Sequence, residues 1–152
     1  MADANAAALP RTVAWLGYGG LIPFLVLMPA SLVDPHHGVV WRDALYAYGG
    51  IILSFVGALH WGFAMSLPGL DDRQRSSAFI WSVVPALIAW PAVLVTPMLA
   101  APLLVLGFVA HYLQDRRLAR HVTLPAWYLP LRLRLSCVAV VCLAAGAFAS
   151  CA

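Results

Sequence analysis

The stretch YAYGGIILSFVGALHWGFAMSL, residues 46–67, decides the fold class of this chain. It lies inside 27 consecutive residues, 44–70, that carry no formal charge. At a rise of about 1.5 Å per residue, this run can cross the roughly 30 Å of hydrocarbon in a bilayer as one helix. Small residues recur at every fourth position on one face, and we expect this strip to pack closely against another helix: Gly50, Ser54, Ala58 and Gly62.

Composition also places the chain in a membrane. Of its 152 residues, 63% are hydrophobic and 10% are charged, whereas a soluble domain carries roughly 25% charged residues. The basic residues are arginines in short segments between apolar runs, a pattern that argues against nucleic-acid binding. The spacings of Cys137, Cys142 and Cys151 match no metal or redox motif. We therefore predict a protein of the lipid bilayer, with no metal site and no nucleic-acid partner.

Five apolar runs predict an all-α bundle of five transmembrane helices, which forms a single membrane domain over residues 1–152. The third and fourth helices come from one uncharged run of 39 residues, 76–114. A straight helix of that length would measure roughly 58 Å, so we expect a hairpin with its turn at Thr96-Pro97. The first helix contains two prolines, which predict a kink or break near Pro29. The predicted spans are 12–33, 44–67, 77–95, 98–113 and 133–151.

The polar segments between the predicted helices indicate the orientation. With five spans, the N-terminus and the second and fourth loops share one side of the membrane. That side holds every arginine except Arg42. Because positively charged segments stay in the cytoplasm, we predict that the N-terminus lies inside and the C-terminus outside. Residues 34–43 are expected to form a short polar loop on the outer side, with Trp41 as an interfacial anchor.

His60, which is followed by Trp61, is the first candidate for a functional group. An ionisable side chain well inside a span marks a possible binding site or proton pathway. The alternative is a neutral histidine that forms a hydrogen bond with a neighbouring helix. His111 lies near the inner end of another span, and two histidines on different helices can ligate a haem iron. However, we expect the two histidines to differ in depth by several ångströms.

Tyr128, Arg132 and Ser136 recur at four-residue spacing near the start of the last predicted span. Arg132 lies close to an aromatic belt, where its guanidinium group can hold a lipid phosphate or a quinone head group. The alternative is that Arg132 only sets the topology through its positive charge. No acidic residue is expected inside any span, which argues against an ion-coupled transporter.

Four motifs run through the chain: LGYGGLIPF at 16–24, YAYGGIILSFVGALHWG at 46–62, WSVVPALIAW at 81–90 and LPAWYLPLRLRLS at 124–136. Together they resemble the uncharacterised membrane protein family that includes transmembrane protein 69. The resemblance implies a multi-pass protein of the bacterial inner (cytoplasmic) membrane, and it supplies no reaction, substrate or catalytic residue. The positions that match the family pattern are Gly17, Tyr18, Gly20, Pro23, His60, Trp61, Gly62, Pro85, Trp127, Tyr128 and Arg132.

These observations predict a non-enzymatic integral membrane protein that supports a larger assembly of membrane-protein subunits or binds lipid. The alternative is a quinone- or haem-binding protein of the respiratory membrane. In that case His60, Trp61, Tyr128 and Arg132 are the candidate ligand-binding residues. A transporter would need a polar path through the spans, and the sequence indicates none.

Overall fold

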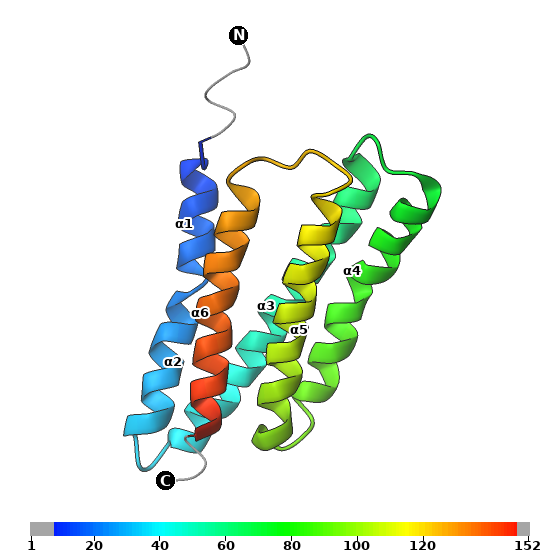
Figure 1. The fold of residues 1–152 in the computed structure, drawn as a ribbon. Helices are drawn as coiled ribbons and strands as arrows, with labels where there is room; N and C mark the ends of the chain where they lie inside the picture. Colours follow the sequence, from blue (N-terminus) through cyan, green and yellow to red (C-terminus); the bar gives the residue numbers. More distant parts are fainter. Residues whose placement is uncertain (1–7, 149–152) are drawn as a thin grey trace.

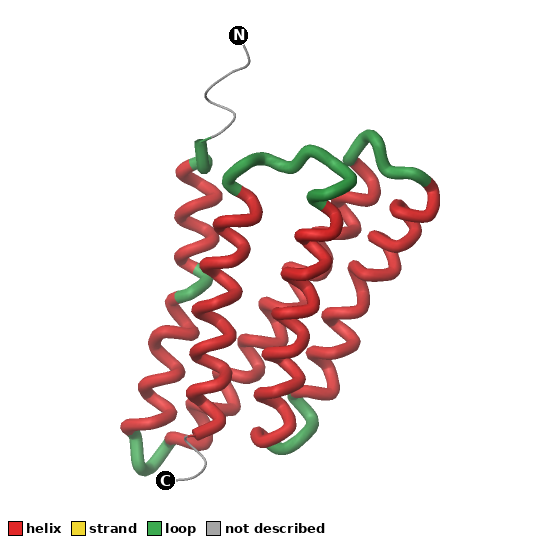
Figure 2. The backbone as a smooth tube through the Cα atoms, in the orientation of Figure 1, coloured by secondary structure: helices red, strands yellow, loops and turns green. Residues whose placement is uncertain are grey.

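Six helices follow one another along residues 8–148, the part of the chain that this computed structural model describes, and this part contains no strand (Figures 1 and 2). Four segments in it are long and apolar enough to cross a membrane: Arg11–Val33, Gly38–Ser66, Pro97–Leu118 and Tyr128–Phe148. The prediction of an all-α fold is therefore confirmed. The helices are α1 (Arg11–Gly19), α2 (Ile22–Val33), α3 (Gly38–Ser66), α4 (Asp72–Ala92), α5 (Pro97–Leu118) and α6 (Tyr128–Phe148).

The first apolar segment is broken near its middle, so that α1 and α2 lie end to end (Figure 1). The break falls at Gly20 and Leu21. A kink or break was predicted near Pro29, and the structure has no break there because Pro29 lies inside α2. A break inside an apolar layer leaves backbone groups without helical partners. The hydroxyl of Tyr48 on α3 satisfies one of them, since it donates to the carbonyl oxygen of Gly20 at 2.9 Å.

α3 begins at Gly38, so the loop before it is much shorter than the predicted 34–43, and Trp41 belongs to the helix. The carboxylate of Asp34 orders this short turn. It accepts hydrogen bonds from Trp41 Nε1 at 3.0 Å and from the backbone N–H groups of His36 and His37 at 2.9 and 3.0 Å. The Trp41 hydrogen bond, followed by the two backbone bonds, lowers the pKa of Asp34 to about 2.

α4 packs along α3 and is less apolar than the four segments named above. It begins with a capping box, in which Asp71 and Gln74 exchange backbone and side-chain hydrogen bonds. The two helices approach closely at Gly57, where an added Cβ would lie 2.7 Å from Cγ of Pro85. The connection to α5 is formed by residues 93–96, at the predicted Thr96-Pro97 position.

The predicted small-residue strip of α3 has no single environment in the structure. Gly50 lies against α4, where an added Cβ would be 3.6 Å from Cβ of Ala89. Ser54 is half-buried, whereas Ala58 and Gly62 are exposed. α3 and α5 approach each other closely at Gly107 of α5, where an added Cβ would lie 2.5 Å from Cδ2 of Leu53 on α3. The small residue at this contact therefore belongs to α5 and not to the predicted strip.

The ends of α5 and α6 differ from the predicted spans in a way that matters for the site. α5 continues to Leu118, past the predicted end at residue 113, and α6 begins at Tyr128, before the predicted start at residue 133. Asp115 therefore lies inside a long apolar helix with a fully buried side chain. The prediction that no acidic residue lies in a span is wrong. The predicted end of the last span at residue 151 and Cys151 lie outside the described residues.

Candidate functional site

The carboxylate of Asp115 is the centre of a buried polar cluster. Its Oδ1 lies 2.9 Å from Nε2 of His60 on α3 and accepts a hydrogen bond of 3.2 Å from the hydroxyl of Tyr128 on α6. Its Oδ2 accepts a hydrogen bond of 2.9 Å from Nε of Arg132, one turn further along α6. A carboxylate can remain buried in apolar surroundings when it is paired and hydrogen-bonded in this way.

His111 joins this cluster from the turn of α5 that precedes Asp115. Its side chain is fully buried, and its Nδ1 accepts a hydrogen bond of 3.1 Å from the indole N–H of Trp81 on α4. The ring of His111 contacts the ring of His60 edge to face, with a centroid separation of 5.1 Å. Four helices therefore contribute to what we call the Asp115 cluster, which consists of His60, Trp81, His111, Asp115, Tyr128 and Arg132.

The hydrogen bonds assign the protons on both histidines. An ionised carboxylate only accepts, so Nε2 of His60 carries the hydrogen that faces Asp115. Nδ1 of His111 accepts from Trp81, so the neutral ring of His111 carries its hydrogen on Nε2. Nδ1 of His60 and Nε2 of His111 are buried, and neither has a hydrogen-bond partner among residues 8–148. Nε2 of His111 lies 3.8 Å from Oδ1 of Asp115. A second proton on either ring would therefore leave a buried N–H group unsatisfied or oppose the Trp81 donor.

The same hydrogen bonds argue against a metal ion at this cluster. His60, His111 and Asp115 each offer a ligand atom within 4.8 Å of the others. However, a histidine that ligates a metal donates its second N–H to an acceptor, and His111 faces the N–H donor of Trp81 instead. The positive charge of Arg132 already neutralises the carboxylate.

Axial haem ligation does not fit this arrangement either. The structure brings His60 and His111 together, with their ring centroids 5.1 Å apart. Their rings contact each other edge to face, which leaves no space for a porphyrin between them. Nε2 of His60 also points at Asp115 rather than at an open volume.

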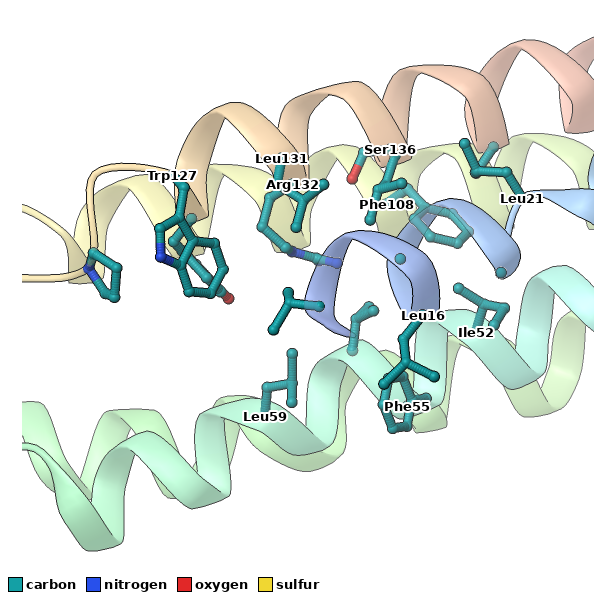
Figure 3. Close-up of a pocket in the computed structure, with 18 of the residues that line it drawn as sticks. Leu16, Leu21, Ile52, Phe55, Leu59, Phe108, Trp127, Leu131, Arg132 and Ser136 are labelled. Atoms are coloured by element: carbon teal, nitrogen blue, oxygen red, sulfur yellow. The ribbon is translucent and has the colours of Figure 1, made fainter. Parts of the chain in front are cut away.

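A cavity of about 430 Å³ adjoins the cluster (Figure 3). Side chains of α1, α2, α3, α5 and α6 form its walls, and nearly all of them are apolar. Leu16 of α1 and Phe55 of α3 belong to these walls and are also exposed, by 74% and 64%. The cavity therefore lies next to the outer surface of the bundle, where apolar side chains of α1 and α3 are exposed.

Polar groups reach the cavity from one face of α6, where Tyr128, Arg132 and Ser136 line it at four-residue spacing. Figure 3 shows the side chains of Arg132 and Ser136 on this helix. Nη2 of Arg132 and Oγ of Ser136 are buried and have no hydrogen-bond partner within the described part of the chain. Because Nε of Arg132 is held by Asp115, the Asp115 cluster fixes the guanidinium group beside the cavity. This wall can donate hydrogen bonds to an acceptor group inside an otherwise apolar volume.

The structure separates the predicted site residues into two groups. It brings together His60, Tyr128 and Arg132 around Asp115, although His60 does not line the cavity. Trp61 is 51% exposed and stacks edge to face on Phe79, so it belongs to neither the cluster nor the cavity.

Sequence reasoning missed Asp115 and Trp81 as members of the site. A signal for Asp115 was present, because His111 and Asp115 are four residues apart and therefore share a helix face with each other. Trp81 carries no comparable signal, since its role depends on the packing of α4 against α5.

The chain is similar to two curated proteins that are both named transmembrane protein 69. The relative from Xenopus tropicalis is 36% identical over 140 residues, which cover 86% of this chain and 51% of the relative. The relative from Mus musculus is 27% identical over 136 residues, which cover 87% of this chain and 54% of the relative. The chain thus spans about half the length of these relatives.

No solved structure matches the chain significantly. The relatives and the four apolar segments together indicate a multi-pass membrane protein. They also confirm the resemblance that the sequence motifs suggested. The family described as "Protein of unknown function (DUF3429)" matches residues 9–148, and this chain belongs to that family.

Proposed function

We propose that this protein binds an amphipathic, lipid-like molecule in the cavity between α1, α3 and α6. The observation that carries the proposal is an apolar cavity of about 430 Å³ with two unpartnered buried polar atoms in one wall, Nη2 of Arg132 and Oγ of Ser136. Sites for small molecules typically measure about 300–1,000 Å³ and combine apolar walls with a few directed polar groups.

The unpartnered atoms favour a bound molecule over an empty cavity. A buried polar group without a hydrogen bond costs about 1–3 kcal/mol. An acceptor on the bound molecule would satisfy Arg132 and Ser136 together, since their side chains lie one helical turn apart. The exposed apolar groups Leu16 and Phe55 border the cavity, so an apolar tail can enter sideways from the bilayer.

The membrane arrangement that supports this function has five crossings, formed by α1 with α2, then α3, α4, α5 and α6. α4 has 21 residues and, at about 1.5 Å per residue, is long enough to cross. The start of α1 and the connections 67–71 and 119–127 lie at one end of the bundle (Figure 1). Six arginines lie at that end, in the first turn of α1 or α4, in the last turn of α5 or in a connection: Arg11, Arg73, Arg75, Arg116, Arg117 and Arg120.

By the positive-inside rule, this arginine-rich end faces the cytoplasm of a bacterial inner membrane, with the N-terminus inside and the C-terminus outside. A phosphatase reporter, which is active only outside the cytoplasm, tests the orientation when it is fused after Ala152. Activity supports five crossings. A fusion that is inactive while a cytoplasmic reporter at the same place is active contradicts them.

A second candidate function is assembly with other membrane-protein subunits. Ala58 and Gly62 on α3 are exposed, and small residues on a membrane helix allow a partner helix to approach closely. Replacing Gly62 with leucine should release a partner that co-purifies with the wild-type protein. The bound lipid-like molecule should remain, because Gly62 does not line the cavity.

Two matched substitutions test the binding function directly. Leu59→Trp places a large ring in the cavity wall, whereas Leu106→Trp places the same ring on the exposed side of α5. Organic extraction of purified protein, followed by mass spectrometry, measures the bound molecule per mole of protein. We expect near-stoichiometric content in the wild type and in Leu106→Trp, and a severalfold loss in Leu59→Trp. Equal content in both variants would overturn the proposal.

A further inference from the structure

The charges around the cavity limit the head group that it can hold. Arg132 is the one charged side chain among the described residues that line the cavity. Its guanidinium group is paired with the carboxylate of Asp115 at 2.9 Å. The charges of Arg132 and Asp115 cancel, so the wall presents hydrogen-bond donors without net positive charge.

A phosphate head group does not suit this wall. A buried anion needs a counter-charge and several hydrogen bonds to replace its water shell. Here the guanidinium group has already used Nε on the carboxylate of Asp115, and no second cation from residues 8–148 lines the cavity. A phosphate oxygen beside Arg132 would also lie close to the negative charge of Asp115.

An uncharged carbonyl oxygen suits the same wall well. It has two lone pairs, so it can accept from Nη2 of Arg132 and from the hydroxyl of Ser136 together. Both donors are at least nine-tenths buried, and neither has another partner. Aromatic rings also line the cavity, among them Phe63, Phe108 and Trp127, and they can pack against a flat ring.

We infer that the cavity selects a molecule with an uncharged carbonyl acceptor on an apolar tail and discriminates against phosphate-bearing lipids. This inference rests on the proposed function and names the class of molecule that the site binds. The carbonyl can come from a quinone ring or from the ester of a neutral acyl lipid, because both present the same acceptor. The aromatic walls favour the ring.

Four probes in neutral detergent micelles separate these possibilities. They are a benzoquinone with a decyl tail, decylbenzene, dioleoylglycerol and dioleoylphosphatidic acid. Each probe is titrated as a mole fraction of the micelle, and its apparent Kd is taken from the rise in Tm of the full chain. We expect the quinone to bind about tenfold more tightly than decylbenzene, because two additional hydrogen bonds form. Phosphatidic acid carries the same ester carbonyl groups as dioleoylglycerol and a phosphate in addition. It should bind more weakly than the quinone and more weakly than dioleoylglycerol.

Two serine variants test the contact itself. Ser136→Ala removes the free hydroxyl and should weaken quinone binding about fivefold without changing decylbenzene binding. Ser54→Ala is the control, since that hydroxyl donates within α3 to the carbonyl oxygen of Gly50 and does not line the cavity. It should leave every Kd unchanged.

The outcomes separate the inference from the proposed function. If the quinone and decylbenzene bind equally, or if phosphatidic acid binds most tightly, the head-group inference is wrong and the lipid-binding function stands. If no probe raises Tm, both fail. If dioleoylglycerol binds more tightly than the quinone and Ser136→Ala weakens it, the carbonyl class is supported with an acyl ester as its source.

Discussion

Replacement of Asp115 by asparagine should be among the most destabilising polar substitutions in this chain. The carboxylate faces donors from His60, Tyr128 and Arg132, and its side chain is fully buried. Asparagine has the same shape, but an NH₂ donor replaces one of the two carboxylate oxygens. This NH₂ group must then face another donor. The guanidinium group of Arg132 then loses its counter-charge. Breaking a buried ion pair in this way costs about 3–5 kcal/mol.

The measurement is the free energy of unfolding in detergent micelles, followed by circular dichroism. Asp72→Asn is the matched control, because Asp72 is exposed in the first turn of α4 and should change stability by about 1 kcal/mol or less. The double variant Asp115→Leu with Arg132→Met should recover part of the loss, since it removes both charges but leaves the donors of His60 and Tyr128 without their acceptor.

Two results would refute this reasoning about Asp115. The first is an Asp115→Asn protein as stable as Asp72→Asn, which would mean that water or lipid head groups already solvate the carboxylate. The second is a double variant at least as unstable as the single one, which would mean that the pair does not carry the effect.

Three further predictions concern the fold around the site. Gly57→Ala should lower the free energy of unfolding by about 1–3 kcal/mol, because its Cβ would overlap Pro85 of α4. Gly62→Ala should be nearly neutral, because no described residue lies within 4 Å of its added Cβ. Equal unfolding free energies of the two variants would contradict this. Tyr48→Phe should cost about 1–3 kcal/mol because the Gly20 carbonyl loses its partner at the break between α1 and α2, and an unchanged Tm would argue against that role. Asp34, with its pKa lowered from 3.8 to about 2, stabilises the fold above pH 4, and this contribution disappears as the pH falls toward 2. Asp34→Asn should flatten that part of the pH–stability curve.

Much of the architecture could be predicted because its causes are local. A run of apolar residues prefers lipid wherever its partners lie, and the helical hydrogen bonds close within each run. The turn before Pro97 also follows from the length of one uncharged run. The position of the break between α1 and α2 was not predicted. One carbonyl group at the break is satisfied by the Tyr48 hydroxyl, 28 residues away in the chain, and a local pattern does not reveal such a partner.

The candidate site was predicted in part for a similar reason. Tyr128, Arg132 and Ser136 share one face of a helix, and this periodicity is visible in the sequence. Asp115 fell outside the predicted span 98–113, because the uncharged run ends at residue 114 and an isolated acid is costly in lipid. Partners inside the bundle offset that cost. The partners of Asp115 lie 55 residues away in the chain at His60 and 17 residues away at Arg132, so the sequence does not reveal them.

The amino-acid sequence by itself determined that this chain is an all-helical membrane protein of an uncharacterised family. The free energy of placing apolar runs in lipid adds up residue by residue, without reference to other segments. The tertiary structure alone decided that Asp115 lies inside the bundle and that Arg132 faces a cavity instead of the membrane surface. A buried charge is stable only beside its counter-charge, and the packing of α3, α5 and α6 determines which groups meet.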